Sequence, residues 1–166
     1  MDEITRLSIQ LGESLQRIRA QVTTAESCTG GGIAEAITRV AGSSGWFEAG
    51  YVTYSNAQKA AQLDVPEPLF MSVGAVSREV VEAMARGARA KANARFAVAV
   101  SGIAGPGGGS PEKPVGTVWL AWADGSRVYA HRHLFEGDRA AVRSQTVVCA
   151  LHGLIRLCAG EIPGQG

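Results

Sequence analysis

The sequence predicts one α/β domain in which helices pack against a mixed β-sheet. Strand-like and helix-like segments alternate in the early part of the chain, an order that is typical of a parallel sheet covered by helices. Later, two strand-like segments flank Asp124-Gly125, a strong hairpin signal that requires at least one antiparallel strand. The chain has 166 residues, of which 46% are hydrophobic and 19% charged, and this composition is that of a single globular domain.

The first half of the chain is expected to run helix, strand, helix, strand, helix. Apolar residues spaced by three and four predict the first helix, and the β-rich run Tyr51–Tyr54 predicts the second strand. Asn56 is expected to cap the third helix. The five segments are 1–20, 22–25, 33–40, 46–55 and 56–63.

The second half begins with Asp64–Gly74, an irregular link that holds two prolines. Ser77 and Asp138 are expected to cap two long helices, and the continuous apolar run Phe96–Val100 suits a central strand covered on both faces. The segments are a helix over 78–93, strands over 96–100, 115–123 and 127–135, and a last helix after Asp138. We assign residues 1–160 to one domain and residues 161–166 to a frayed tail.

Composition and charge exclude several classes of protein. The net charge is +1 and the basic residues are scattered, so no nucleic-acid partner is expected. No apolar run reaches the ~18 residues that span a bilayer, so no membrane association is expected either. The acidic start at Asp2-Glu3 is unlike a signal peptide, and three cysteines fit a reducing compartment. We therefore expect a cytoplasmic protein.

Ser27 is the first candidate for chemistry, because it lies between a strand and a glycine-led helix. That position exposes a side chain at the carboxyl edge of a sheet, where open α/β folds bind ligands. Gly30 and Gly31 allow backbone N–H groups to approach a ligand closely, and such groups can stabilise an oxyanion. From spacing alone, Ser27 or Thr29 could equally be only a helix cap. Cys28 is either a second candidate nucleophile or a small buried side chain.

Lys59 is the candidate base for Ser27. It lies one turn into the helix that follows the second strand, near the same edge of the sheet. A serine needs a base before it attacks a carbonyl, and a lysine can act as that base if burial lowers its pKa. Thirteen of the 16 basic residues are arginines, so a retained lysine hints that arginine would not serve. The alternative is a solvated surface lysine.

Two segments could bind a phosphate group. The glycine-rich loop Ser101–Ser110 follows the expected central strand, although it lacks the Gly-Lys-Ser/Thr ending of a Walker A loop. Arg139 and Arg143 lie one turn apart at the start of the last helix, where they are either phosphate ligands or surface residues.

Histidine and tryptophan residues give weaker signals. His131 and His133 share one face of a strand and could bind zinc, but no third ligand is recognisable, so we expect no metal. Trp46, Trp119 and Trp122 suit core or dimer contacts, and no basic groove supports a base-stacking role for them.

Four motifs occur in the same order as in a known protein family. They are Thr24–Gly31 (Thr-Ala-Glu-Ser-Cys-Thr-Gly-Gly), Tyr54-Ser55-Asn56 with Lys59, Ser101–Pro106 (Ser-Gly-Ile-Ala-Gly-Pro) and Lys113–Val118 (Lys-Pro-Val-Gly-Thr-Val). Over nearly its whole length the chain resembles the C-terminal domain of the competence/damage-inducible CinA family, in its stand-alone form. The further N-terminal domain of longer members is not expected here. Gly32 and Gln21 depart from the usual pattern, away from the expected chemistry.

The resemblance implies a three-layer α/β/α sandwich with a mixed, mostly parallel five-stranded sheet. It also implies a nicotinamide mononucleotide deamidase, which hydrolyses this small molecule to nicotinic acid mononucleotide and ammonia in pyridine nucleotide recycling. Ser27 matches the nucleophile, Lys59 its base and Tyr54 a catalytic neighbour. The expected substrate-binding residues are Thr29, Gly30, Gly31, Asn56, Ser101, Gly102, Arg139 and Arg143. We expect an acyl-enzyme mechanism without metal or organic cofactor, in a homo-oligomer.

Two other functions stay open from the residues alone. A non-catalytic nucleotide-binding module that regulates or docks onto a competence or DNA-repair partner would keep the glycine loops. Such a module would have no use for a paired Ser27 and Lys59. An amidase with Cys28 as its nucleophile is the third possibility.

Overall fold

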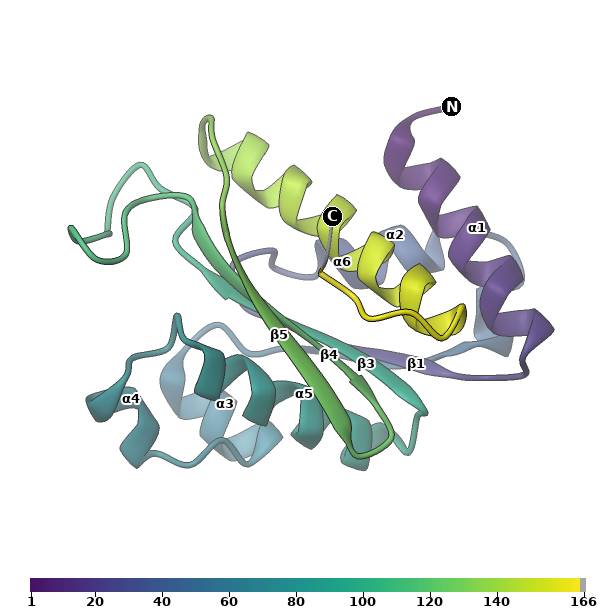
Figure 1. The fold of residues 1–166 in the computed structure, drawn as a ribbon, viewed down its shortest axis with the longest axis horizontal. Coiled ribbons are helices and arrows are strands. Elements are labelled where there is room, and N and C mark those ends of the chain that lie inside the picture. Colours follow the sequence, from purple (N-terminus) through teal and green to yellow (C-terminus); the bar gives the residue numbers. More distant parts are fainter. Residues whose placement is uncertain (165–166) are drawn as a thin grey trace.

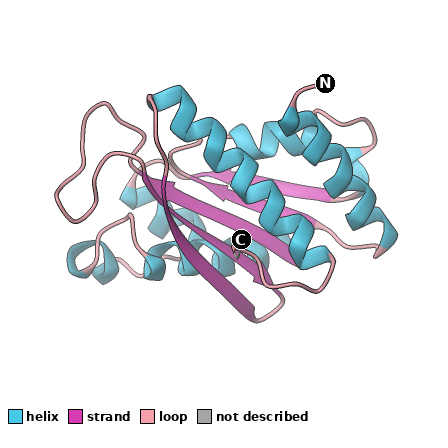
Figure 2. Cartoon of the chain, turned by 45° about the horizontal axis from the view of Figure 1, so that its top comes forward, coloured by secondary structure: helices cyan, strands magenta, loops and turns pink. Residues whose placement is uncertain are grey.

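Five strands form one mixed sheet in the computed structural model, which describes residues 1–164 (Figures 1 and 2). They are β1 (Val22–Glu26), β2 (Phe47–Val52), β3 (Phe96–Gly102), β4 (Thr117–Asp124) and β5 (Arg127–Leu134). Their order across the sheet is β2-β1-β3-β4-β5. β1 pairs in parallel with β2 and β3, whereas β4 pairs antiparallel with β3 and β5. Only β4 runs against the other strands, which confirms the expected mixed and mostly parallel sheet.

Helices cover both faces of this sheet and complete the expected three-layer sandwich (Figure 1). They are α1 (Glu3–Arg17), α2 (Gly32–Thr38), α3 (Asn56–Leu63), α4 (Pro68–Ser72), α5 (Arg78–Ala92) and α6 (Arg139–Cys158), with a short 3₁₀ helix, η1 (Ser43–Gly45). The apolar side chains of α1, α2 and α6 pack on one face of the sheet, and those of α3 and α5 pack on the other. Each face therefore has its own hydrophobic core.

Strand β3 separates the two cores. Its side chains alternate, so that Val98 and Val100 point to the α6 side while Ala97 and Ala99 point to the α5 side. All four are fully buried, which explains why this strand is apolar without interruption. Small alanines on the α5 side leave room for the helix layer that carries the candidate base.

Two local expectations are wrong. The N-cap of α3 is Ser55, whose hydroxyl accepts a hydrogen bond from Gln58 N at 3.1 Å, and Asn56 is the first helical residue. Ser55 has the extended backbone that an N-cap needs, so its hydroxyl rather than the Asn56 amide faces the free N–H group. The segment expected to be irregular also contains α4, which begins at Pro68, where the missing N–H group costs nothing.

The chain end and the cysteines add two further facts. Pro163 is buried and Arg156 Nε donates to Ile162 O at 3.1 Å, so residues 161–164 of the expected tail lie against the domain. The last two residues of that tail, 165–166, lie outside the described residues. All three cysteines are free thiols.

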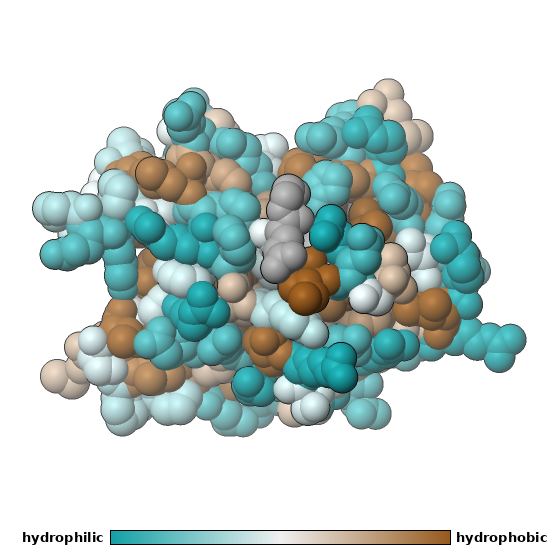
Figure 3. All heavy atoms as spheres, viewed as in Figure 1, coloured by the Kyte–Doolittle hydropathy of each residue, from teal (hydrophilic) through white to brown (hydrophobic). Residues whose placement is uncertain are grey.

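No helix within residues 1–164 has the length and apolar character to cross a bilayer. The visible part of the face in Figure 3 is mostly hydrophilic and carries apolar side chains in separate patches.

The close approach of α5 to the end of α3 gives a test of the packing. A Cβ atom at Gly87 would overlap the backbone carbonyl of Leu63, which cannot move aside as a side chain would. We expect Gly87→Ala to lower the free energy of unfolding by about 1–3 kcal/mol in urea denaturation. Gly45→Ala is the matched control, because nothing lies within 4 Å of its added Cβ. Equal stability of the two variants would contradict this packing.

Candidate active site

Ser27 and Lys59 meet at the carboxyl edge of the sheet. Ser27 directly follows β1, and its N–H group donates to Val100 O of β3 at 3.2 Å, which holds the serine in line with the sheet. Lys59 lies in the first turn of α3 and extends back toward β1. Its Nζ lies 2.9 Å from Ser27 Oγ. The structure therefore brings the candidate nucleophile and the candidate base, which are 32 positions apart in the sequence, within hydrogen-bond distance.

Lys59 is buried without a carboxylate partner. Its side chain is only 1% exposed, and Nζ donates to the carbonyl oxygens of Thr53 at 2.9 Å and Tyr54 at 3.1 Å. Among the described residues, Lys59 forms no salt bridge. Burial lowers the pKa of Lys59 to about 8, because the charged ammonium is poorly solvated there. A useful fraction of this lysine is therefore neutral near physiological pH.

The turn after Ser27 leaves backbone N–H groups available. Gly30 N donates to Ser27 O and Gly32 N donates to Thr29 O, both at 3.0 Å. Gly30 and Gly31 have φ values of 58° and 103°, which only glycine adopts without strain. The N–H groups of Thr29 and Gly31 donate to no other group within residues 1–164. These two N–H groups, and not that of Gly30, are the candidates for an oxyanion site.

Glu26 caps α2, which corrects the idea that Ser27 or Thr29 is the helix cap. The Glu26 carboxylate is fully buried, and it accepts hydrogen bonds from Ile33 N at 2.8 Å and Ala34 N at 3.0 Å. The cap residue by position is Gly31, which has no side chain to offer. Sequence reasoning missed this role, although an acidic residue just before a helix start is a recognisable signal.

Three predicted side chains surround the pair at its open side. Tyr54 is 60% exposed, and its hydroxyl accepts a hydrogen bond from Arg139 Nη2 at 2.9 Å. Arg139 Nη1 also donates to Gly105 O at 2.9 Å, so it links Tyr54 to the glycine-rich loop. Arg143 Nη2 donates to Thr29 O at 3.2 Å. Tyr54 thus contacts Lys59 through its carbonyl group and Arg139 through its phenol hydroxyl.

The other predicted site residues are Ser101, Gly102, Asn56 and Thr29. Ser101 is the second-last residue of β3, on the α5 side of the sheet, and is buried, so it lies at the same edge and on the same side as Ser27. A Cβ at Gly102 would come within 2.6 Å of Val118 Cγ2, which shows that this glycine is required by packing against β4. Asn56 is exposed at the start of α3. Thr29 is buried, and its hydroxyl donates to Glu26 Oε1.

Cys28 is unsuited to nucleophilic chemistry. Its side chain is 4% exposed and belongs to the core on the α6 side of the sheet, opposite the side that carries Lys59. Burial raises the pKa of its thiol to about 11, so the thiol is protonated at neutral pH. Adjacent residues at the end of β1 thus point to opposite sides, and only Ser27 faces the candidate base.

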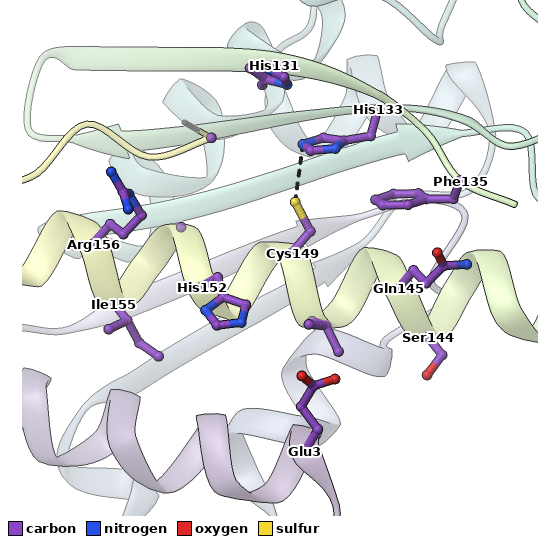
Figure 4. Close-up of a pocket in the computed structure, with 13 residues that line it drawn as sticks. Glu3, His131, His133, Phe135, Ser144, Gln145, Cys149, His152, Ile155 and Arg156 are labelled. Carbon is purple, nitrogen blue, oxygen red and sulfur yellow. Dashed lines mark hydrogen bonds between the residues drawn. The ribbon is translucent and has the colours of Figure 1, made fainter. Parts of the chain in front are cut away.

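A cavity of about 720 Å³ lies elsewhere, between α6 and β5 (Figure 4). His131, His133 and His152 line it together with Cys149, whose sulfur lies 3.4 Å from His133 Nε2. Burial raises the pKa of Cys149 to about 12 and lowers that of His133, so this pair is neutral. Within residues 1–164, no three His, Cys, Asp or Glu side chains are grouped to hold a metal ion. The cavity is on the other side of the sheet from Lys59.

Comparisons with known proteins agree on one family. The family model described as the CinA C-terminal domain matches residues 4–158. A nicotinamide-nucleotide amidohydrolase PncC from Pseudomonas putida is 74% identical over 157 residues, which cover 95% of this chain and 98% of that protein. The protein of the same name from Escherichia coli K12 is 54% identical over 153 residues, 92% of this chain and 93% of that one.

A solved structure gives the same result for the fold. The crystal structure of the competence/damage inducible protein CihA from Agrobacterium tumefaciens superposes with a TM-score of 0.91 at 45% sequence identity. The match covers 95% of this chain and 96% of that one.

The burial of Lys59 predicts a pH dependence of stability. Its native pKa of about 8 lies below the ordinary value of 10.5, so between these values the unfolded chain binds a proton that the native chain does not. The destabilising effect is full below pH 8, and the free energy of unfolding then rises with pH, by at most about 1.4 kcal/mol per unit. Urea denaturation of wild type and Lys59→Met across this interval isolates the effect. A constant difference between the two would contradict it.

Proposed function

The chain belongs to the CinA C-terminal domain family, and we propose that it is an enzyme that hydrolyses nicotinamide mononucleotide to nicotinic acid mononucleotide and ammonia. Two relatives that match it over almost their full lengths carry the name nicotinamide-nucleotide amidohydrolase. The observation that carries the proposal is the buried contact of Lys59 Nζ with Ser27 Oγ at 2.9 Å. This contact supplies a nucleophile and a base to attack a carboxamide.

The first half of the proposed reaction forms a tetrahedral intermediate at Ser27. Neutral Lys59 takes the proton of the Ser27 hydroxyl as Oγ attacks the carboxamide carbon, and the carbonyl oxygen becomes an oxyanion. The N–H groups of Thr29 and Gly31 support it by hydrogen bonding. The carbonyls of Thr53 and Tyr54 accept hydrogen bonds from the ammonium that forms at Lys59.

The second half returns the enzyme to its starting state. The Lys59 ammonium gives its proton to the leaving nitrogen, so that ammonia departs as the C–N bond breaks and the ester with Ser27 forms. Lys59, neutral again, takes a proton from water as the water oxygen attacks the ester carbon. Ser27 then leaves with that proton, and the carboxylic acid product is released.

Arg139 and Arg143 are the proposed ligands of the substrate phosphate. Both lie at the start of α6 and reach the rim of the site, where they meet Tyr54, Thr29 and the glycine-rich loop. The start of α2 cannot serve this purpose, because the Glu26 carboxylate already accepts from its N–H groups. Guanidinium groups bind phosphate oxygens in a bidentate manner, which suits this task.

The remaining expectations belong to the same proposal. Ser101, Gly102, Asn56, Gly30 and Gly31 are proposed to shape the substrate site with Thr29. We also propose that the enzyme works in the cytoplasm, as a homo-oligomer, in pyridine nucleotide recycling, and without a metal or organic cofactor. A purely nucleotide-binding function is less well supported, because it gives no reason to bury an unpaired Lys59 against Ser27.

The test is incubation of the pure protein with nicotinamide mononucleotide, with ammonia and the acid product both followed. We expect Ser27→Ala to lose nearly all activity, because Ser27 is the one nucleophile within residues 1–164 whose side chain contacts Lys59 Nζ. Cys28→Ala is the matched control at the adjacent position and should keep most of the rate, since its thiol is buried and protonated. A strong chelator should leave the rate unchanged. Active Ser27→Ala with inactive Cys28→Ala would move the reaction to the thiol.

Replacement of Lys59 by arginine separates a base from a fixed positive charge. An arginine stays protonated at any working pH, so we expect Lys59→Arg to be as inactive as Lys59→Ala, with a loss of ~10²-fold or more. Substrate binding should be measured alongside turnover, because the guanidinium is also larger. In wild type, kcat should rise with pH up to about 8, as Lys59 loses its proton. Near-normal turnover by Lys59→Arg would place the base elsewhere.

A further inference from the structure

The Glu26 carboxylate is the most extensively hydrogen-bonded side chain next to the reacting pair. It is fully buried at the end of β1, and it forms no salt bridge among the described residues. A buried carboxylate without a cation is costly unless hydrogen bonds balance its charge. Here the balance comes from the N-terminus of α2, where backbone N–H groups donate to the carboxylate and a negative charge is favourable.

The partners of this carboxylate all belong to the segment that follows Ser27. Oε1 accepts from Thr29 Oγ1 at 2.5 Å and from Ile33 N at 2.8 Å, while Oε2 accepts from Ala34 N at 3.0 Å. The carboxylate thus joins the end of β1 to the start of α2. The turn 27–31 lies between the end of β1 and the start of α2, so the hydrogen bonds of the carboxylate hold its two ends together.

The backbone of the same residue reaches the other half of the pair. The carbonyl oxygen of Glu26 accepts from Thr53 N at 2.9 Å, and the Thr53 carbonyl in turn accepts from Lys59 Nζ at 2.9 Å. Glu26 therefore contacts the segment that follows Ser27 through its carboxylate. Through its main-chain carbonyl it contacts Thr53, whose own carbonyl binds Lys59 Nζ.

We propose that Glu26 is a positioning residue that acts through Thr29, holding the turn 27–31 so that Ser27 Oγ and the free N–H groups face the substrate carboxamide. This inference rests on the proposed function. The hydroxyl of Thr29 donates to Glu26, whereas the Thr29 N–H group donates to no other group within residues 1–164. A shift of the turn by a fraction of an ångström would misplace both the nucleophile and the oxyanion donors.

An amide cannot replace this carboxylate. In Glu26→Gln, one terminal atom becomes an NH₂ donor that faces a donor on the protein, so at least one of the three hydrogen bonds is lost. Thr29→Val removes the same Thr29–Glu26 bond from the other end, at almost constant volume. Thr29→Ser keeps the hydroxyl. Glu35→Gln is the matched control, because Glu35 is in the first turn of α2 but pairs with Arg39 at the surface, at 2.6 Å.

The experiment measures kcat and KM with nicotinamide mononucleotide, the pH profile of kcat, and the rate at which a fluorophosphonate labels Ser27 by intact mass. For Glu26→Gln and Thr29→Val we expect kcat and labelling to fall about 10- to 100-fold, with KM little changed. The pH at which kcat rises should stay the same, because Lys59 is unaffected. Thr29→Ser, which keeps the hydroxyl, should recover most of the rate that Thr29→Val loses, and Glu35→Gln should behave as wild type. The double variant should be no slower than either single one.

Wild-type rates in a folded Glu26→Gln would overturn the inference, and so would a shifted pH profile, which would mean that the charge acts on Lys59. If Glu26→Gln fails to fold, Thr29→Val decides the question by the same two rates. Labelling does not depend on the substrate, so it separates the two proposals. A protein that is labelled at Ser27 but does not hydrolyse the nucleotide would refute only the proposed function. A protein that does neither would refute both.

Discussion

The site depends on the burial of one ammonium group against two backbone carbonyls. Lys59 is held by Thr53 O and Tyr54 O, and no carboxylate neutralises it. A neighbouring carboxylate would favour the protonated form of Lys59, which could then not act as the proposed base at neutral pH. Carbonyl groups accept hydrogen bonds but add no net charge, so they orient the amine while burial keeps its pKa low. This arrangement requires the chain to turn from β2 into α3 within a few residues.

That requirement accounts for the local structure between β2 and α3. The carbonyls of Thr53 and Tyr54 must turn toward Lys59, so they cannot take part in the ladder with β1, and β2 ends at Val52. Ser55 then begins α3 directly, which puts Lys59 one turn into the helix and within reach of Ser27. On the other side of β1, the buried Glu26 carboxylate starts α2 in the same way. The two helices that flank β1 therefore both begin at the site.

Much of this arrangement can be predicted from the sequence, whereas several of the contacts around the site cannot. The apolar run at β3 and the Asp124-Gly125 hairpin define the sheet, because periodicity and turn chemistry are local signals. Ser27 and Lys59 could be paired since both follow strands that end at one edge. The contact of the Tyr54 carbonyl with Lys59 could not, because main-chain groups leave no trace in residue type. The cap formed by Glu26 was missed, although an acidic residue ahead of a helix is a recognisable signal. The short helix α4 was missed because two prolines favour an irregular link.

The two arginines at the rim differ from the reacting pair in how far water and ions reach them. Arg143 is exposed and Arg139 lies at the open side of the site, whereas Lys59 is shielded from solvent. At 0.1 M ionic strength, dissolved ions largely screen the attraction between exposed charges that are more than about 10 Å apart, but they screen buried charges much less. Under the proposed function, capture of an anionic nucleotide is thus sensitive to ionic strength, while the chemical step at Ser27 and Lys59 is not. A cell that accumulates salt under osmotic stress would then weaken substrate capture without slowing the chemical step.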